Sequence, residues 1–186
     1  MAARPVRAWI ARHFAATRSP PSEHQIRYDR PMSQPQDNPG VRVPPPALYA
    51  LAVLGGYVIN RWWPLPVGDG VWPHALAWAL VVLWLLVTVI SIGNFRRWRT
   101  SIVPVRPATA LVISGPYRFT RNPMYVGLTA LTVALSLFLD TWWAMVLLIP
   151  VLLVVRVFVI APEERYLQRR FGADYVAYTQ RVRRWL

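Results

Sequence analysis

The chain has 186 residues, of which 55% are hydrophobic and 16% charged, too few charged residues for the surface of an ordinary soluble domain. All 21 basic residues are arginine, so the formal charge of +13 persists at any relevant pH. With no cysteine in the sequence, disulfides, thiol nucleophiles and thiolate metal sites are excluded.

A basic chain can bind nucleic acid or anionic lipid, and the position of its arginines separates the two. Here the arginines cluster beside apolar segments, which favours lipid headgroups. We therefore expect a membrane protein with membrane lipids and no nucleic acid among its partners.

Residues 1–46 hold nine of the 18 prolines and seven arginines, with little apolar periodicity. Such a composition cannot bury enough apolar surface to fold alone. We predict a disordered N-terminal extension, followed by one membrane domain over 47–186.

Four apolar segments follow the extension, at about 47–63, 71–93, 123–139 and 142–161. A helix rises about 1.5 Å per residue, so segments of this length reach across or nearly across a hydrocarbon core of about 30 Å. The pattern predicts an all-α polytopic membrane protein with about four transmembrane helices. Gly55-Gly56 in the first segment would let a neighbouring helix approach closely.

Arginine counts in the connections predict the orientation, because cytoplasmic loops retain positive charge. Six arginines lie between Phe95 and Asn122 and six more follow Ala161, whereas the two opposite connections offer only Arg61 and Asp140. We expect an integral protein of the cell inner membrane with both termini and the middle loop in the cytoplasm.

The third and fourth segments are expected to form a tight hairpin, since only Asp140 and Thr141 separate them. A hairpin brings the loop before Pro123 to the same level as the cytoplasmic tail 162–186. We predict that the tail forms amphipathic helices broken at Gly172, with Asp174 as cap of the second.

Two features at this level allow more than one interpretation. Asn122 can cap a helix that begins at Pro123, where backbone N–H groups face either water or a carboxylate. Glu163 and Glu164 either stabilise the start of a tail helix or hold an ammonium, a sulfonium or ribose hydroxyls.

Arg156 lies inside the fourth segment, where a charge marks a functional site by default. In a continuous α-helix it would share a face with Glu163, seven residues later, and pair with it. The alternative is an anion-binding residue that faces a cavity. The three histidines are too scattered for a metal site, so we predict none.

Several motifs together resemble the isoprenylcysteine carboxyl methyltransferase family, within a wider group that includes membrane phospholipid N-methyltransferases. They are Gly115-Pro116-Tyr117-Arg118, Thr120-Arg121-Asn122-Pro123-Met124-Tyr125-Val126-Gly127, Glu163-Glu164 and Phe171-Gly172-Ala173-Asp174-Tyr175 with Tyr178. The resemblance covers roughly residues 71–186, and the ordered combination is far more specific than any single motif.

The resemblance implies a membrane methyltransferase that uses S-adenosylmethionine and acts on a lipidic or prenylated acceptor, such as an isoprenylcysteine carboxylate. The alternatives are a phospholipid N-methyltransferase and a non-enzymatic protein that binds a lipid or a partner. The cofactor would lie at the cytoplasmic face, held by residues of the two motif segments: Tyr117, Arg121, Asn122, Pro123, Tyr125, Glu163 and Glu164. Arg156 and Tyr125 are the residues we expect to act on the substrate, Arg156 by orienting an anionic group.

At one position the chain departs from the carboxyl methyltransferases, which usually have His before the proline where this chain has Asn122. Asparagine can hydrogen-bond a cofactor or substrate but cannot act as a base. A carboxylate acceptor needs no base, so placing the two reactants would supply most of the catalysis.

Overall fold

The computed structural model describes residues 44–68, 70–100 and 108–185, all of which belong to the unit Asn38–Leu186. The extension predicted over 1–46 lies, up to residue 43, outside the described residues. Within the described part every element is helical, and β pairing is limited to an isolated bridge between Thr120 and Arg183. The all-α prediction is therefore confirmed.

Each of the four apolar segments forms a helix: α3 covers Pro45–Trp62, α4 Val71–Arg97, α5 Pro123–Phe138 and α6 Trp143–Val154. Pro45 and Pro123 stand in the first turns of α3 and α5, where the missing N–H is not needed and the fixed φ suits a helix. The second helix runs four residues past its predicted end at 93, and Arg96 and Arg97 stabilise its C-terminal dipole.

The fourth helix continues beyond its predicted end at 161. A π-helical segment, η2 (Val155–Ile160), joins α6 directly to α7 (Ala161–Phe171), which gives one helical run of 29 residues, Trp143–Phe171. In a regular α-helix the ring of Pro162 would meet the carbonyl of Phe158, four residues earlier. The wider π turn, in which the N–H of Ala161 donates to the carbonyl of Arg156, lets the helix pass this proline.

Two helical runs, Val71–Arg97 and Trp143–Phe171, are long and apolar enough to cross a membrane, and α5 is a shorter apolar helix. Their side chains are distributed as in membrane helices: small Ala77 and Ala144 are fully buried, whereas Leu86 and Phe158 are 55% and 67% exposed. Large apolar side chains on the outer surface support association with a membrane.

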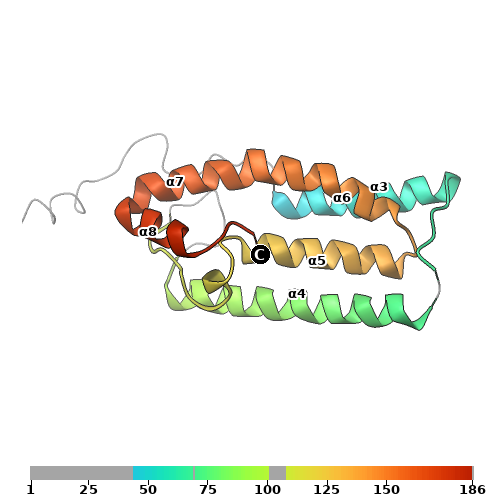
Figure 1. Ribbon diagram of the computed structural model, residues 1–186, viewed down its shortest axis with the longest axis horizontal. Coiled ribbons are helices and arrows are strands. Elements are labelled where there is room, and N and C mark those ends of the chain that lie inside the picture. Colours follow the sequence, from blue (N-terminus) through green and yellow to red (C-terminus); the bar gives the residue numbers. More distant parts are fainter. Residues whose placement is uncertain (1–43, 69, 101–107, 186) are drawn as a thin grey trace, which may run out of the picture. The chain divides into compact units, whose positions relative to one another are not determined.

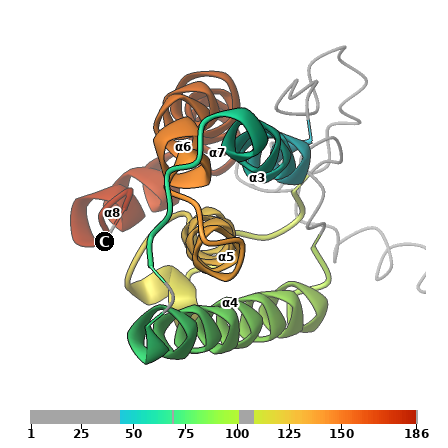
Figure 2. The same ribbon diagram turned by 90° about the vertical axis from the view of Figure 1, so that its right-hand side faces the viewer.

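α5 lies between α4 on one side and α3 and α6 on the other (Figure 2). Small residues allow these contacts. A Cβ at Gly56 would lie 2.5 Å from the backbone nitrogen of Ala144, so α3 and α6 touch at a position that only glycine fits. This contact confirms that the Gly55-Gly56 pair permits close helix approach, specifically at Gly56.

The predicted hairpin between α5 and α6 is confirmed, with a connection over Leu139–Trp142. Asp140 in this turn accepts hydrogen bonds from the N–H groups of Val67 and Gly68, at 2.8 and 2.9 Å, and so joins it to the α3–α4 connection. At the opposite end of the bundle, α5 begins beside α7 (Figure 1).

The tail helix breaks at Gly172, as predicted, with φ +54° and α8 following over Ala173–Arg181. The prediction that Asp174 caps α8 is wrong. Gly172 occupies the cap position and Asp174 lies in the first turn, where its charge stabilises the helix dipole instead.

Candidate active site

The two motif segments meet at the end of the bundle where α5 begins, as the hairpin predicted. A short 3₁₀ turn, η1 (Gly115–Arg118), precedes Pro123, which is fully buried in the first turn of α5. Asn122 occupies the predicted N-cap position, but its side chain makes no cap hydrogen bond to the helix. Opposite this helix start lies the first turn of α7, with both glutamates.

Tyr125 and Glu163 form one direct link between the segments. The Tyr125 hydroxyl donates toward the Glu163 carboxylate, at 2.8 Å from one oxygen and 3.0 Å from the other. Burial raises the pKa of Glu163 to about 7; the Tyr125 hydrogen bond opposes this shift and the neighbouring charge of Glu164 adds to it. Glu163 therefore titrates near neutral pH.

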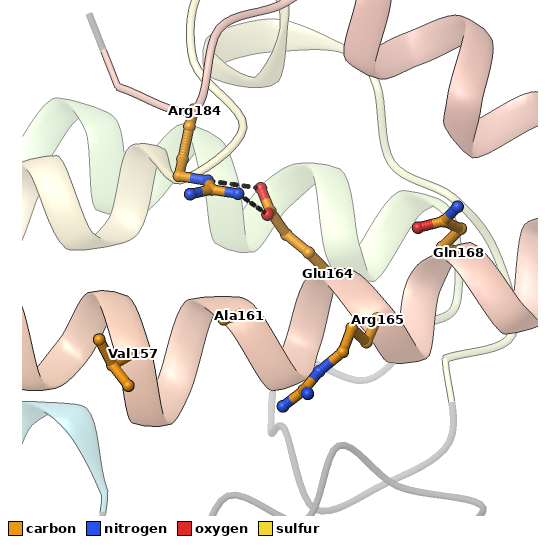
Figure 3. A pocket seen from close by; sticks show the side chains of 6 residues that line it. All are labelled: Val157, Ala161, Glu164, Arg165, Gln168 and Arg184. Atoms are coloured by element: carbon orange, nitrogen blue, oxygen red, sulfur yellow. Dashed lines mark hydrogen bonds and ion pairs between the residues drawn. The ribbon is translucent and has the colours of Figure 1, made fainter.

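The neighbouring carboxylate, Glu164, lies between two guanidinium groups. Arg121 contacts one oxygen at 3.0 Å. Arg184 donates to both oxygens, with Nε at 3.1 Å from Oε1 (Figure 3). The three charges sum to +1. Glu164 is thus compensated within the protein, whereas no ion pair is recorded for Glu163 among the described residues.

Asn122 and Thr120 are buried and bind the C-terminal segment. The Asn122 amide Nδ2 and the Thr120 hydroxyl each donate to the carbonyl of Arg184, both at 3.0 Å. The N–H of Arg121 donates to the carbonyl of Arg183 at 2.9 Å. The polar groups of this motif therefore hold the chain's own backbone.

Tyr117 is fixed from two sides. Its ring meets Phe95 of α4 edge-on, at 5.7 Å between ring centroids, and its carbonyl accepts a hydrogen bond from the Tyr178 hydroxyl at 2.8 Å. Asn94 also donates to the carbonyl of Ser114 at 3.2 Å, which holds the turn against α4. Burial raises the pKa of Tyr117, so its hydroxyl stays protonated.

Arg156 is not brought into this cluster. Its side chain is exposed on η2 and makes no ion pair with Glu163 or any other described residue. The helical phase that would align it with Glu163 assumes about 3.6 residues per turn, and the π segment between them breaks this phase.

An open pocket of about 450 Å³ lies beside Glu164. Val157 and Ala161 line its apolar part, while Arg165, Gln168 and Arg184 line its polar part (Figure 3). Val157 belongs to η2, and Ala161, Arg165 and Gln168 belong to α7, whereas Arg184 comes from the C-terminal segment. Among the described residues, no group of three His, Cys, Asp or Glu side chains has the arrangement of a metal site.

Residues 72–174 match the phospholipid methyltransferase family. The chain belongs to this family. The match spans α4, the motif before Pro123, both glutamates and the start of α8, and so includes the site described above except for Tyr178 and Arg184. It confirms the membership in the wider group of membrane methyltransferases that the motifs indicated.

This family member also resembles an uncharacterized protein of Haemophilus influenzae, with 43% identity over 63 residues. The alignment covers 34% of the present chain and all of the relative. No solved structure matches the chain.

Three contributors to the site were not predicted from sequence: Asn94, Arg184 and the hydroxyl of Tyr178. Tyr178 belongs to the tail motif, which pointed to its importance but not to its contact with Tyr117. Arg184 looked like one of many tail arginines, and its pairing depends on the path of the tail after Gly172.

Proposed function

We propose that this member of the phospholipid methyltransferase family transfers a methyl group from S-adenosylmethionine to a lipidic or prenylated acceptor in the membrane. The observation that carries the proposal is the meeting of the two motif segments at one end of an apolar helix bundle, through Tyr125 and Glu163. A soluble cofactor and a membrane-embedded acceptor would be brought together at such a boundary.

The residues present fit this cofactor. Its sulfonium and ammonium groups are cationic, and Glu163 is a partly buried carboxylate without a cationic partner among the described residues. Its carboxylate suits Arg121, whose buried Nε has no hydrogen-bond partner within the described part. Buried tyrosine rings, such as Tyr175 and Tyr178, can contact an adenine face or a cation.

The cofactor, when bound, supplies an electrophilic methyl group. The chain's own residues would orient the reactants and exclude water. Tyr125 orients the Glu163 carboxylate, and Tyr117, Asn122 and Pro123 form the side of the site next to α5. Arg156, exposed on η2, would orient an anionic group of an acceptor approaching from the lipid. Positioning of this kind supplies most of the rate enhancement in a displacement reaction.

The acceptor class divides the proposal into two. A prenylated carboxylate is favoured by the motif resemblance, and a phospholipid amine by the description of the matched family. An amine must lose a proton before it attacks, so at saturating cofactor its methylation would accelerate with rising pH, whereas a carboxylate would react almost uniformly above about pH 5.

Calorimetric titration of detergent-purified protein with S-adenosylmethionine and its demethylated product tests the proposal. We expect one binding site, with affinity about tenfold lower in Glu163→Gln and in Glu164→Gln. Asp174→Asn, which removes an exposed carboxylate of α8, is the matched control and should bind as the wild type does. Folded wild-type protein that binds neither compound would favour a non-enzymatic lipid- or partner-binding role.

Methyl-labelled cofactor incubated with a membrane lipid extract identifies the acceptor. Label in a phospholipid headgroup indicates N-methylation, and base-labile label on a prenylated carboxylate indicates an ester. Binding without any transferred label would contradict the enzymatic part of the proposal.

A further inference from the structure

The last described residues, Val182–Trp185, return from α8 across the start of α5 (Figure 1). We call this segment the C-terminal strap. Its backbone is bound by three consecutive motif residues: the carbonyl of Arg183 accepts from the Arg121 N–H, and the carbonyl of Arg184 accepts from Thr120 and Asn122.

Two side chains fix the strap from other directions. The Arg184 guanidinium reaches Glu164 in the first turn of α7, with two hydrogen bonds to its carboxylate. The ring of Trp185 packs on the apolar cluster that includes Tyr49, Val155 and Val159. The strap thus connects the start of α5, the start of α7 and the core beside η2.

Arg184 also fixes the orientation of the Glu164 carboxylate. Arg121 approaches one carboxylate oxygen, and the planar guanidinium of Arg184 binds across both, a geometry that fixes rotation of the group. Without Arg184, Glu164 would keep one cationic partner and an open pocket beside it. The strap therefore determines where this carboxylate points.

From these contacts we propose that the strap completes the cofactor site, with Arg184 as a positioning residue for Glu164 and Asn122 as the donor that anchors the strap. This inference rests on the proposed function for the role of Glu164, whereas the anchoring itself does not. In this role the residue before Pro123 must donate an N–H hydrogen bond to the strap but need not act as a base. Asparagine and histidine can both do this.

Substitutions at Arg184 test the positioning role. In Arg184→Ala we expect about tenfold weaker binding of S-adenosylmethionine, and faster amide hydrogen exchange over residues 182–185 and 120–122. Arg184→Lys keeps the charge without the planar fork and should restore part of the affinity. Arg169→Ala removes an exposed arginine of α7 that makes no hydrogen bond or ion pair with the described residues, and should leave binding and exchange unchanged.

Substitutions at Asn122 test the anchor. Asn122→His retains a donor and should keep the strap protected from exchange, whereas Asn122→Asp presents a carboxylate to the Arg184 carbonyl and should release it. Thermal unfolding of each variant shows that the fold persists. Equal exchange in the His and Asp variants would reject the anchoring role of Asn122.

The outcomes separate this inference from the proposed function. If wild-type protein binds no cofactor, the proposed function fails, and hydrogen exchange in Arg184→Ala still decides whether Arg184 holds the strap. If the wild type binds and Arg184→Ala binds equally well, the positioning role is overturned. If Arg169→Ala weakens cofactor binding as much as Arg184→Ala does, the effect comes from net charge alone. The positioning role of Arg184 is then overturned as well.

Discussion

Glu163 and Glu164 are adjacent in sequence but differ in electrostatic environment. Successive residues of a helix point about 100° apart, so Glu164 faces Arg121 and Arg184 while Glu163 faces the Tyr125 hydroxyl. A carboxylate that already has two guanidinium partners gains little from another cation, so Glu164 would accept hydrogen bonds from the ribose hydroxyls of the cofactor instead. Glu163, partly buried and hydrogen-bonded to a neutral phenol, is the better partner for a sulfonium or an ammonium.

The pKa of Glu163 makes this assignment testable by pH. Below about pH 7 the carboxyl is mostly protonated, and above it the charged form prevails, so a cationic ligand should bind more tightly as pH rises. Between pH 6 and 7.5 the ionised fraction should rise roughly eightfold for a pKa of about 7, and the affinity for S-adenosylmethionine about four- to fivefold, because the neutral carboxyl, like glutamine, should still bind about tenfold more weakly. Calorimetry in matched buffers measures the slope.

Glu163→Gln should remove most of this pH dependence, whereas Asp174→Asn should retain it. The demethylated product lacks the sulfonium charge but keeps the ammonium. If affinity rises with pH for the cofactor alone, the sulfonium lies at Glu163. If it rises equally for both compounds, the ammonium lies there. A flat profile for wild-type protein would contradict the assignment of Glu163 as cation partner.

At the scale of single elements, the hairpin was predictable because two long apolar segments separated by two residues can pack only as antiparallel neighbours. That one inference brought Tyr125 near Glu163 and Arg121 near Glu164. The joint between α6 and α7 was not predictable. Pro162 suggests a helix start, and the sequence does not distinguish a new helix from a π turn that carries the old one past the proline.

Close helix approach is the feature of the bundle most sensitive to a single methyl group. Gly56→Ala would place its Cβ 2.5 Å from the Ala144 nitrogen, so α3 and α6 must separate. Such overpacking costs about 1–3 kcal/mol, and the unfolding temperature in detergent should fall by about 2–10 °C. Gly93→Ala in α4, where a Cβ meets nothing within 4 Å, is the control for helix propensity.

Gly93→Ala should be neutral or slightly stabilising, because alanine favours a helix over glycine by about 1 kcal/mol. Gly55→Ala should fall between the two variants, since its Cβ would meet only the flexible end of Leu147, at 3.0 Å. If Gly56→Ala were as stable as Gly93→Ala, the α3–α6 contact would not be as close as the structure has it.

Across the whole domain, polar contacts are divided between the two ends of the bundle. One end joins the α3–α4 connection to the α5–α6 turn through Asp140, and the other holds the glutamates, the motif before Pro123 and the C-terminal strap. Periodicity predicted the helices between them. Periodicity did not predict the strap. Arg184 reaches Glu164 only because the chain reverses at Gly172 and Tyr178 binds the Tyr117 carbonyl.

The distribution of arginines predicts the orientation of the protein in the membrane. Because the chain has no cysteine, single introduced cysteines can test this prediction by labelling. Phe119, 75% exposed beside the site, and Val71, 87% exposed at the start of α4, are at opposite ends of α4 and α5. In intact cells an impermeant maleimide should label Val71→Cys directly but Phe119→Cys only after permeabilisation, because arginine-rich connections stay in the cytoplasm. The cysteine-free wild type measures background, and detergent-solubilised protein shows that both thiols react. Labelling of Phe119→Cys from outside would put the site on the side without soluble cofactor, and would therefore contradict both the orientation and the proposed reaction.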